Sequence, residues 1–166
     1  QGLSQFAKGY GLDIPIETAE VLRNEWFHAW PEMKDFFKFV SCLIGDGGGV
    51  IRQLGSKRVR GGLTFTQACN SYFQGLAADG AKAALFEVSK RCYIDPGSRL
   101  YRSRPIMFIH DEIIIETPID KASEAAEELS HVMRFVMKKF TPNVPIKTTV
   151  AMMDRWYKDA EEVRDG

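Results

Sequence analysis

The sequence predicts an α+β fold in which a small antiparallel sheet packs against long helices. Three segments, 16–43, 64–92 and 120–140, repeat apolar residues at the period of an amphipathic helix. Two short apolar runs rich in β-branched residues, 106–109 and 113–115, are each typical of a buried strand. The 166 residues are enough for one domain with a sizeable core.

Composition limits the classes of protein that the chain can belong to. Lys plus Arg and Asp plus Glu both number 22, so the net charge argues neither for nor against nucleic acid as a partner. The three cysteines show no Cys-x-x-Cys spacing, and we expect reduced, buried thiols in an intracellular setting. No apolar run is long enough to span a bilayer, and no signal peptide is visible.

The first long helical segment is expected to form two helices. Pro31 interrupts the apolar stripe of 16–43, and Thr18 is placed to cap the first helix. Aromatic residues recur there at helical spacing, which favours core positions over a base-stacking platform. They are Trp26, Phe27, Trp30, Phe36 and Phe37.

A basic ribbon is expected over 50–60, with two strands turning near Gly55-Ser56 and ending at Gly61-Gly62. It carries four cations and no acid, which makes it the strongest local basic patch. Contact with nucleic-acid phosphates would explain the pattern, and a solvated ribbon explains it nearly as well. The four cations are Arg52, Lys57, Arg58 and Arg60.

The longest helical segment, 64–92, carries a polar stripe. Gln67, Asn70 and Gln74 recur at the spacing of one helix face, either for ligand contact or as an ordinary wet face. Several alanines follow and keep the helix slim, which permits another element to approach closely.

The remaining elements follow from turn and capping signals. After a turn at 95–98 and the central strand pair, Asp120 is placed to cap the last long helix, and Pro142 ends it. A further strand is expected over 144–151 and a short terminal helix over 154–163.

The triplet His110-Asp111-Glu112 lies between the two central strand runs and is expected at the tip of a hairpin. A tight turn normally prefers Asn-Gly or Asp-Gly, and two adjacent carboxylates repel each other. At a strand end without nearby cations, such a pair is suited to a hard divalent metal such as magnesium. A solvated acidic turn is the alternative.

Several motifs of the chain, in their order along the sequence, resemble those in the C-terminal part of family A DNA polymerases. This family is the group of bacterial DNA polymerase I and many phage replicative enzymes. Ile109-His110-Asp111-Glu112 is similar to the Val-His-Asp-Glu heart of the family's palm motif C. The stretch from Asn70 to Asp79, followed by Lys82, is similar to its Asn-x-x-x-Gln-Gly-x-Ala-Ala-Asp-x-x-Lys helix. Further matches extend the resemblance over nearly the whole chain: Ile14-Pro15, Trp30-Pro31 and the stretch from Val144 to Trp156.

The resemblance implies template-directed DNA synthesis, in which a dNTP is added to the 3′ end of a primer with two magnesium ions. Asp111 would be a direct metal ligand, and Glu112 would bind through water or tune the site. His110 would contact the primer terminus, or is merely satisfied within the hairpin. Asn70 and Gln74 would donate to minor-groove acceptors that all base pairs of the primer-template share.

The departures from the family pattern imply a piece of a polymerase. No counterpart of motif A is found, and the Lys and Tyr of the nucleotide-binding finger helix are missing, their place lying just upstream of Gln1. Thr66 stands where bacterial members tend to have a DNA-contacting Arg, and Arg60 is the candidate to replace it. The short stretch 55–62 looks more like phage members. Residues 1–49 would then be helices of the fingers, and 50–166 the C-terminal half of the palm.

We therefore expect that the chain does not polymerise alone. It would act with the N-terminal part of the polymerase, in the same or a separate polypeptide, in the cytoplasm of a bacterium or a phage-infected cell. A second hypothesis is a non-catalytic DNA-binding or assembly subunit of a split polymerase. A third is a metal-dependent nuclease or other phosphotransferase on an unrelated hairpin, which predicts a further carboxylate cluster. The other acids considered, Asp46, Asp79 and Asp95, are scattered.

Overall fold

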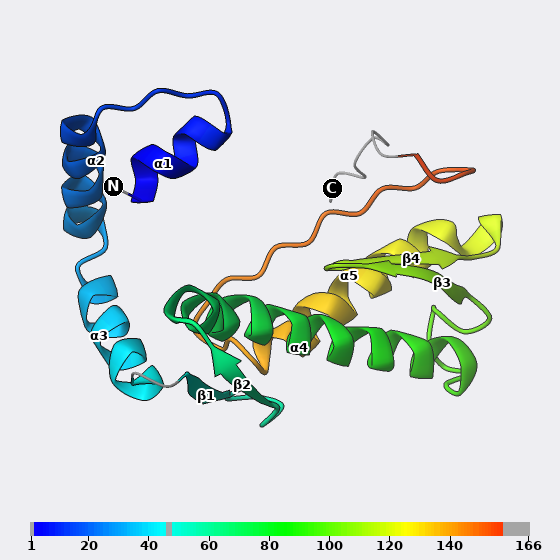
Figure 1. The fold of residues 1–166 in the computed structure, drawn as a ribbon. Coiled ribbons are helices and arrows are strands. Elements are labelled where there is room, and N and C mark those ends of the chain that lie inside the picture. Colours follow the sequence, from blue (N-terminus) through cyan, green and yellow to red (C-terminus); the bar gives the residue numbers. More distant parts are fainter. Residues whose placement is uncertain (1, 46–47, 158–166) are drawn as a thin grey trace. The chain divides into compact units, whose positions relative to one another are not determined.

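The computed structural model describes residues 2–45 and 48–157 and confirms the α+β prediction. The described residues form five α-helices and two small two-stranded sheets (Figure 1). In chain order the elements are α1 Gly2–Gly9, α2 Ile16–Ala29, α3 Glu32–Ile44, β1 Gly49–Arg52, β2 Val59–Leu63, α4 Phe65–Tyr93, β3 Arg104–Ile109, β4 Glu112–Glu116, the 3-10 turn Ile119–Lys121 and α5 Ala122–Lys138. None of these helices is both long and apolar enough to cross a membrane.

The chain divides into two compact units. The first contains described residues of 1–50 and 61–69, and the second those of 51–60 and 70–157. The division does not follow a single cut near residue 50, because 61–69 belong with the N-terminal helices. The assignment of 1–49 to fingers and 50–166 to palm stays a prediction.

The first unit confirms the break at Pro31, since α2 ends at Ala29 and α3 begins at Glu32. The Phe37 ring lies 6.1 Å from that of Trp26 and 5.6 Å from that of Phe65, so an aromatic cluster joins α2, α3 and the start of α4. Core positions were the wrong prediction for Trp26 and Trp30, which are 40% and 55% exposed. Trp30 lies where α2 ends, and Trp26 contacts the cluster with one side of its ring while the rest faces solvent.

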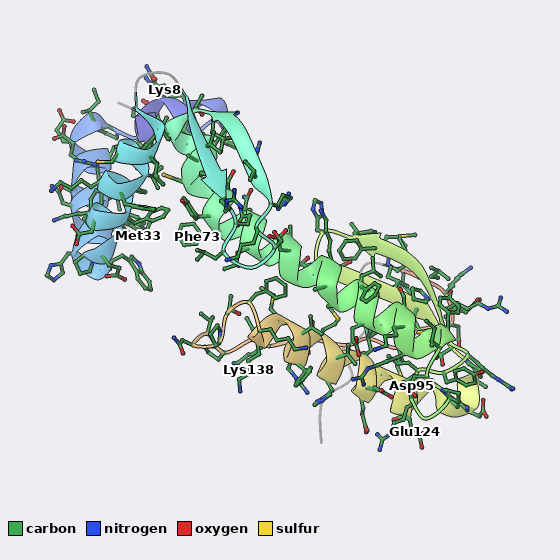
Figure 2. The ribbon with its side chains drawn as sticks, turned by 90° about the horizontal axis from the view of Figure 1, so that it is seen from below. Lys8, Met33, Phe73, Asp95, Glu124 and Lys138 are labelled. Atoms are coloured by element: carbon green, nitrogen blue, oxygen red, sulfur yellow. The ribbon has the colours of Figure 1, made fainter. Side chains whose placement is uncertain are left out.

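Two predicted helix caps are wrong. Thr18 lies inside α2, because Pro15 already has φ −55° and the helix starts immediately after it. Asp120 lies in the 3-10 turn, where the Lys121 N–H donates to the Pro118 carbonyl at 3.0 Å, and no side-chain cap bond opens α5. The charges at the two ends of α5 still suit the helix dipole, with Glu124 in the first turn and Lys138 in the last (Figure 2).

The core of the second unit lies between α4, α5 and the hairpin of β3 and β4, which run side by side in Figure 1. The hairpin contributes Ile113, with Phe108 and Ile115 packed against the cluster. The buried residues contributed by the two helices and the turn before β3 are Ala84, Val88, Cys92, Leu100, Ala125, Leu129, Val132 and Val136.

The prediction of buried strands holds for one face of the hairpin only. Ile113 is 8% exposed, whereas Ile106 and Met107 are 57% and 44% exposed. A two-stranded sheet has two faces, and the helices of this unit cover one of them. The ladder also shifts register between Pro105 and Met107, which makes Ile106 the extra residue of a bulge.

The strand predicted over 144–151 is wrong. The segment follows an extended course in Figure 1, but the described residues show a single bridge position, at Ala151, and no ladder. A side-chain bond holds the segment to α5 instead, since the hydroxyls of Ser130 and Thr148 share a hydrogen bond of 2.6 Å. The terminal helix expected over 154–163 is not formed at 154–157, and its remainder lies outside the described residues.

Candidate functional site

The hairpin places His110 and Asp111 in a two-residue turn, with Ile109 opposite Glu112. The sequence therefore located the tip correctly. His110 has φ +54°, and positive φ at the first central residue alone is the pattern of a type II′ turn. A non-glycine residue there costs about 1 kcal/mol. All three side chains of the triplet are exposed, so the strained turn holds an imidazole and two carboxylates in solvent.

The tip carries two carboxylates that suit a hard cation, but not a full set of ligands. No group of three or more His, Cys, Asp or Glu side chains within 2–45 and 48–157 is placed to hold a metal ion. The nuclease hypothesis required a further cluster of this kind, and the described part of the chain contains none. Asp111 and Glu112 fit magnesium by their oxygen donors and exposure, provided that other ligands complete the site.

The three amides of the polar stripe on α4 differ in their roles: Gln67 caps the helix, and the other two are exposed. Thr64 and Gln67 form a reciprocal capping box, in which the Thr64 N–H donates to Gln67 Oε1 at 3.1 Å and the Gln67 N–H donates to Thr64 Oγ1 at 3.4 Å. Gln67 therefore stabilises the start of its own helix. Asn70 and Gln74 are both exposed and, four residues apart, share one face of α4.

The tip of the ribbon lies against α4, and two of its four cations are held there. Arg58 Nη2 is 3.0 Å from Asp79 Oδ1, and the Asp79 side chain is only 5% exposed. Arg60 Nη1 donates to Ser71 Oγ at 3.0 Å.

The other two cations of the ribbon are less engaged. Lys57 Nζ donates to the Leu54 carbonyl at 2.7 Å on an exposed turn. Arg52 is exposed on β1, and no side-chain partner of it is seen among the described residues.

Sequence reasoning missed Asp79 as a partner of the ribbon and treated it as a scattered acid. The available signal was its helical register, since Ser71, Gly75 and Asp79 recur every four residues and form one row on α4. The alanines of 77–84 predicted a close approach, and α5 makes one there, since an added Cβ at Gly80 would overlap the Met137 side chain. The approach of the ribbon at Gly75, where an added Cβ would overlap Gln53, lies before those alanines and was not predicted.

Comparisons with known proteins point in one direction. A profile described as DNA polymerase family A matches residues 2–158. The DNA polymerase I of Aquifex aeolicus is 31% identical over 163 residues, which cover 96% of this chain and 27% of that protein. The DNA polymerase I of Deinococcus radiodurans is 26% identical over 166 residues, covering 94% and 16%. The protein of the same name from Helicobacter pylori strain J99 is 26% identical over 154 residues, covering 87% and 16%. The chain thus spans about a quarter or less of the length of these relatives.

Proposed function

The chain belongs to DNA polymerase family A, and we propose that it is part of a template-directed DNA polymerase that adds dNTPs to a primer 3′ end. The observation that carries this proposal is the exposed His-Asp-Glu tip on a hairpin, in a chain whose residues 2–158 match the family.

In this proposal the hairpin tip holds magnesium. Asp111 is the direct ligand, and Glu112 acts through water or by tuning the site. When bound, the ions neutralise phosphate charge and activate the attacking 3′ oxygen. The strained turn keeps His110 beside the two carboxylates, where its imidazole can contact the primer terminus.

The surface of α4 and the ribbon would hold the primer-template. The exposed amides of Asn70 and Gln74 donate to minor-groove acceptors that every base pair presents, so they check the geometry of a pair without reading its sequence. Arg52, Lys57, Arg58 and Arg60 supply positive charge for the phosphates, and Lys57 and Arg52 have the most freedom to do so.

The chain alone would not synthesise DNA. The described residues hold two carboxylates at the hairpin tip and no third ligand group, which favours an active site completed by polypeptide outside these residues. The same observation supports the second candidate, a DNA-binding or assembly subunit of a split polymerase. Bacterial or phage-infected cytoplasm is the proposed setting for either.

Asp111→Ala tests the metal assignment in the full polypeptide or complex that contains this chain. Primer extension should fall by roughly a thousandfold or more, because a principal ligand of the reacting ions is lost, while duplex affinity changes less than about threefold. Asp120→Ala is the matched control, since Asp120 is an exposed aspartate away from the hairpin tip, and it should extend primers normally. Normal extension by Asp111→Ala would disprove the metal assignment. Robust extension by the 166-residue chain alone would contradict the need for further polypeptide.

A further inference from the structure

A buried carboxylate on α4 receives the tip of the basic ribbon. Both oxygens of Asp79 are engaged, Oδ1 by Arg58 Nη2 at 3.0 Å and Oδ2 by the hydroxyl of Ser56. The Asp79 side chain is 5% exposed, whereas that of Arg58 is 48% exposed. The pair therefore connects a buried point on the helix to a solvent-facing turn.

A second set of contacts holds the ribbon on α4 at Gly75 and Ser71, one and two helical turns before Asp79. Gln53 is 5% exposed, and its Nε2 donates to the Ser71 carbonyl at 2.5 Å. It fits because Gly75 has no side chain, and the Arg58 guanidinium also donates to the Gly75 carbonyl at 3.4 Å. The row formed by Ser71, Gly75 and Asp79 is thus a seat for the ribbon.

The turn itself depends on this seat. The Gln53 N–H donates to the Arg58 carbonyl at 2.9 Å, and the Lys57 N–H donates to the Gln53 carbonyl at 3.1 Å. Lys57 has φ +60°, a conformation that is unfavourable for a lysine unless its surroundings hold it. Without Asp79 the turn would lose the carboxylate that binds both Ser56 and Arg58.

The seat divides the four cations into two kinds. The guanidinium groups of Arg58 and Arg60 are bound to side chains of α4. Lys57 makes one exposed bond to the Leu54 carbonyl, which a phosphate oxygen can replace, and Arg52 is exposed. Asn70 and Gln74 occupy the row of α4 next to that of Ser71 and Gly75.

We propose that Asp79 is a positioning residue for duplex DNA: it seats the ribbon on α4 so that Lys57 and Arg52 present their charges to phosphates, while Arg58 and Arg60 serve as anchors. The phosphate half of this inference rests on the proposed function, and the seating half does not. A solvated ribbon without a seat would show neither behaviour.

The seat is tested without DNA by hydrogen exchange in the 166-residue chain. Asp79→Asn keeps the shape of the side chain but removes its charge, and Arg58→Gln breaks the same pair from the ribbon side. Both should speed exchange at the Gln53 and Lys57 amides by at least about tenfold, whereas Asp120→Asn should not. Unchanged exchange in both ribbon variants would overturn the seat.

The phosphate half is tested by a double-mutant cycle between Asp79 and Lys57, which do not touch. Lys57→Ala should weaken duplex binding about three- to tenfold and reduce the slope of log K against log salt by about 0.9. In the Asp79→Asn background the same change should cost less than about twofold. Lys121→Ala, at an exposed cation of the 3-10 turn outside the ribbon, should leave the salt slope unchanged.

The two experiments distinguish the seating of the ribbon on α4 from its contact with phosphates. Equal losses on Lys57→Ala in both backgrounds would show that Asp79 does not position this cation. If the full polypeptide or complex that contains the wild-type chain fails to bind duplex DNA, the proposed DNA contact and the phosphate half are both refuted, and the exchange experiment still decides the seat.

Discussion

Glu128 joins three segments of the second unit through one carboxylate. It accepts hydrogen bonds from Arg91 Nη1 at 2.7 Å, the Ser98 hydroxyl at 2.9 Å and the Arg99 N–H at 2.5 Å. The first partner lies near the end of α4, and the other two lie in the turn that leads to the hairpin. Replacing Glu128 by Gln keeps the shape and removes the charge, so it tests how much this junction stabilises the fold.

The structure sets the expected size of the effect. The Glu128 side chain is 12% exposed, so its bonds are well shielded from water, but Arg91 is 25% exposed and can be partly hydrated when its partner is lost. The substitution weakens three charge-assisted hydrogen bonds, although the Gln oxygen can still accept some of them. We therefore expect the free energy of unfolding to fall by about 2–3 kcal/mol. For an m-value near 2 kcal/mol per molar, this lowers the urea midpoint by about 1 M.

Urea unfolding followed by circular dichroism measures this loss. The neighbouring Glu127 provides the control, because its carboxylate pairs with Arg99 Nη1 at 3.0 Å while the side chain is 65% exposed. Glu127→Gln should change stability by less than about 0.5 kcal/mol. If both substitutions shifted the midpoint by the same small amount, the reasoning about the buried junction would be refuted.

The same variant predicts a pH dependence. Burial by itself raises the pKa of Glu128, but the hydrogen bonds from Arg91, Ser98 and Arg99 together lower it by more. The pKa of Glu128 therefore lies below that of an ordinary glutamate. The stabilisation by ionised Glu128 is therefore complete above the unfolded-state pKa of about 4.3 and is lost as pH falls through the lower folded-state value. The stability difference between wild type and Glu128→Gln should be constant from neutral pH to about pH 5 and shrink below about pH 4.

Two further predictions concern packing and thiol chemistry. Gly75→Ala should lower the stability of the chain by about 1–3 kcal/mol, because the added methyl meets the buried Gln53 amide. Gly97→Ala is the control and should have little effect, since its Cβ would approach only Asp95 Oδ1, at 3.4 Å. Equal melting temperatures of the two variants would contradict this prediction. The expectation of buried thiols is wrong for Cys42, which is exposed, and is confirmed for Cys69 and Cys92. Burial, with a smaller contribution from Glu128, raises the pKa of Cys92 to about 11, so iodoacetamide at pH 8 should label Cys42 first. Equal labelling of Cys92 in the native chain would count against its burial.

Local rules in the sequence placed most elements of this chain. Pro31 separates α2 from α3 because a proline lacks the N–H that a helix interior needs. The turn near Gly55-Ser56 and the hairpin tip at His110 and Asp111 lie where the sequence predicted them. The predicted end of the ribbon at Gly61-Gly62 is wrong, because β2 continues through both glycines to Leu63. The cap predictions failed at Thr18 and Asp120 because a helix or 3-10 turn begins directly after an earlier proline, Pro15 or Pro118, and already contains these residues.

The failed strand at 144–151 shows the limit of such rules. Its apolar and β-branched residues favour an extended chain, and the segment follows an extended course in Figure 1. A strand also needs a neighbouring backbone to pair with, and partners are set by the fold. Among the described residues, the segment is instead held to α5 by the hydrogen bond between Ser130 and Thr148.

The sequence alone was enough to predict the fold class, the family and the exposed His110-Asp111-Glu112 tip, because each depends on residue types at short spacing. Only the tertiary structure decided which charges are free and which are held. Asp79 and Arg58 are 21 residues apart, and Arg91 and Glu128 are 37 apart. Each of these two pairs forms because packing brings the residues together and shields the carboxylate from water, and no local pattern encodes that contact.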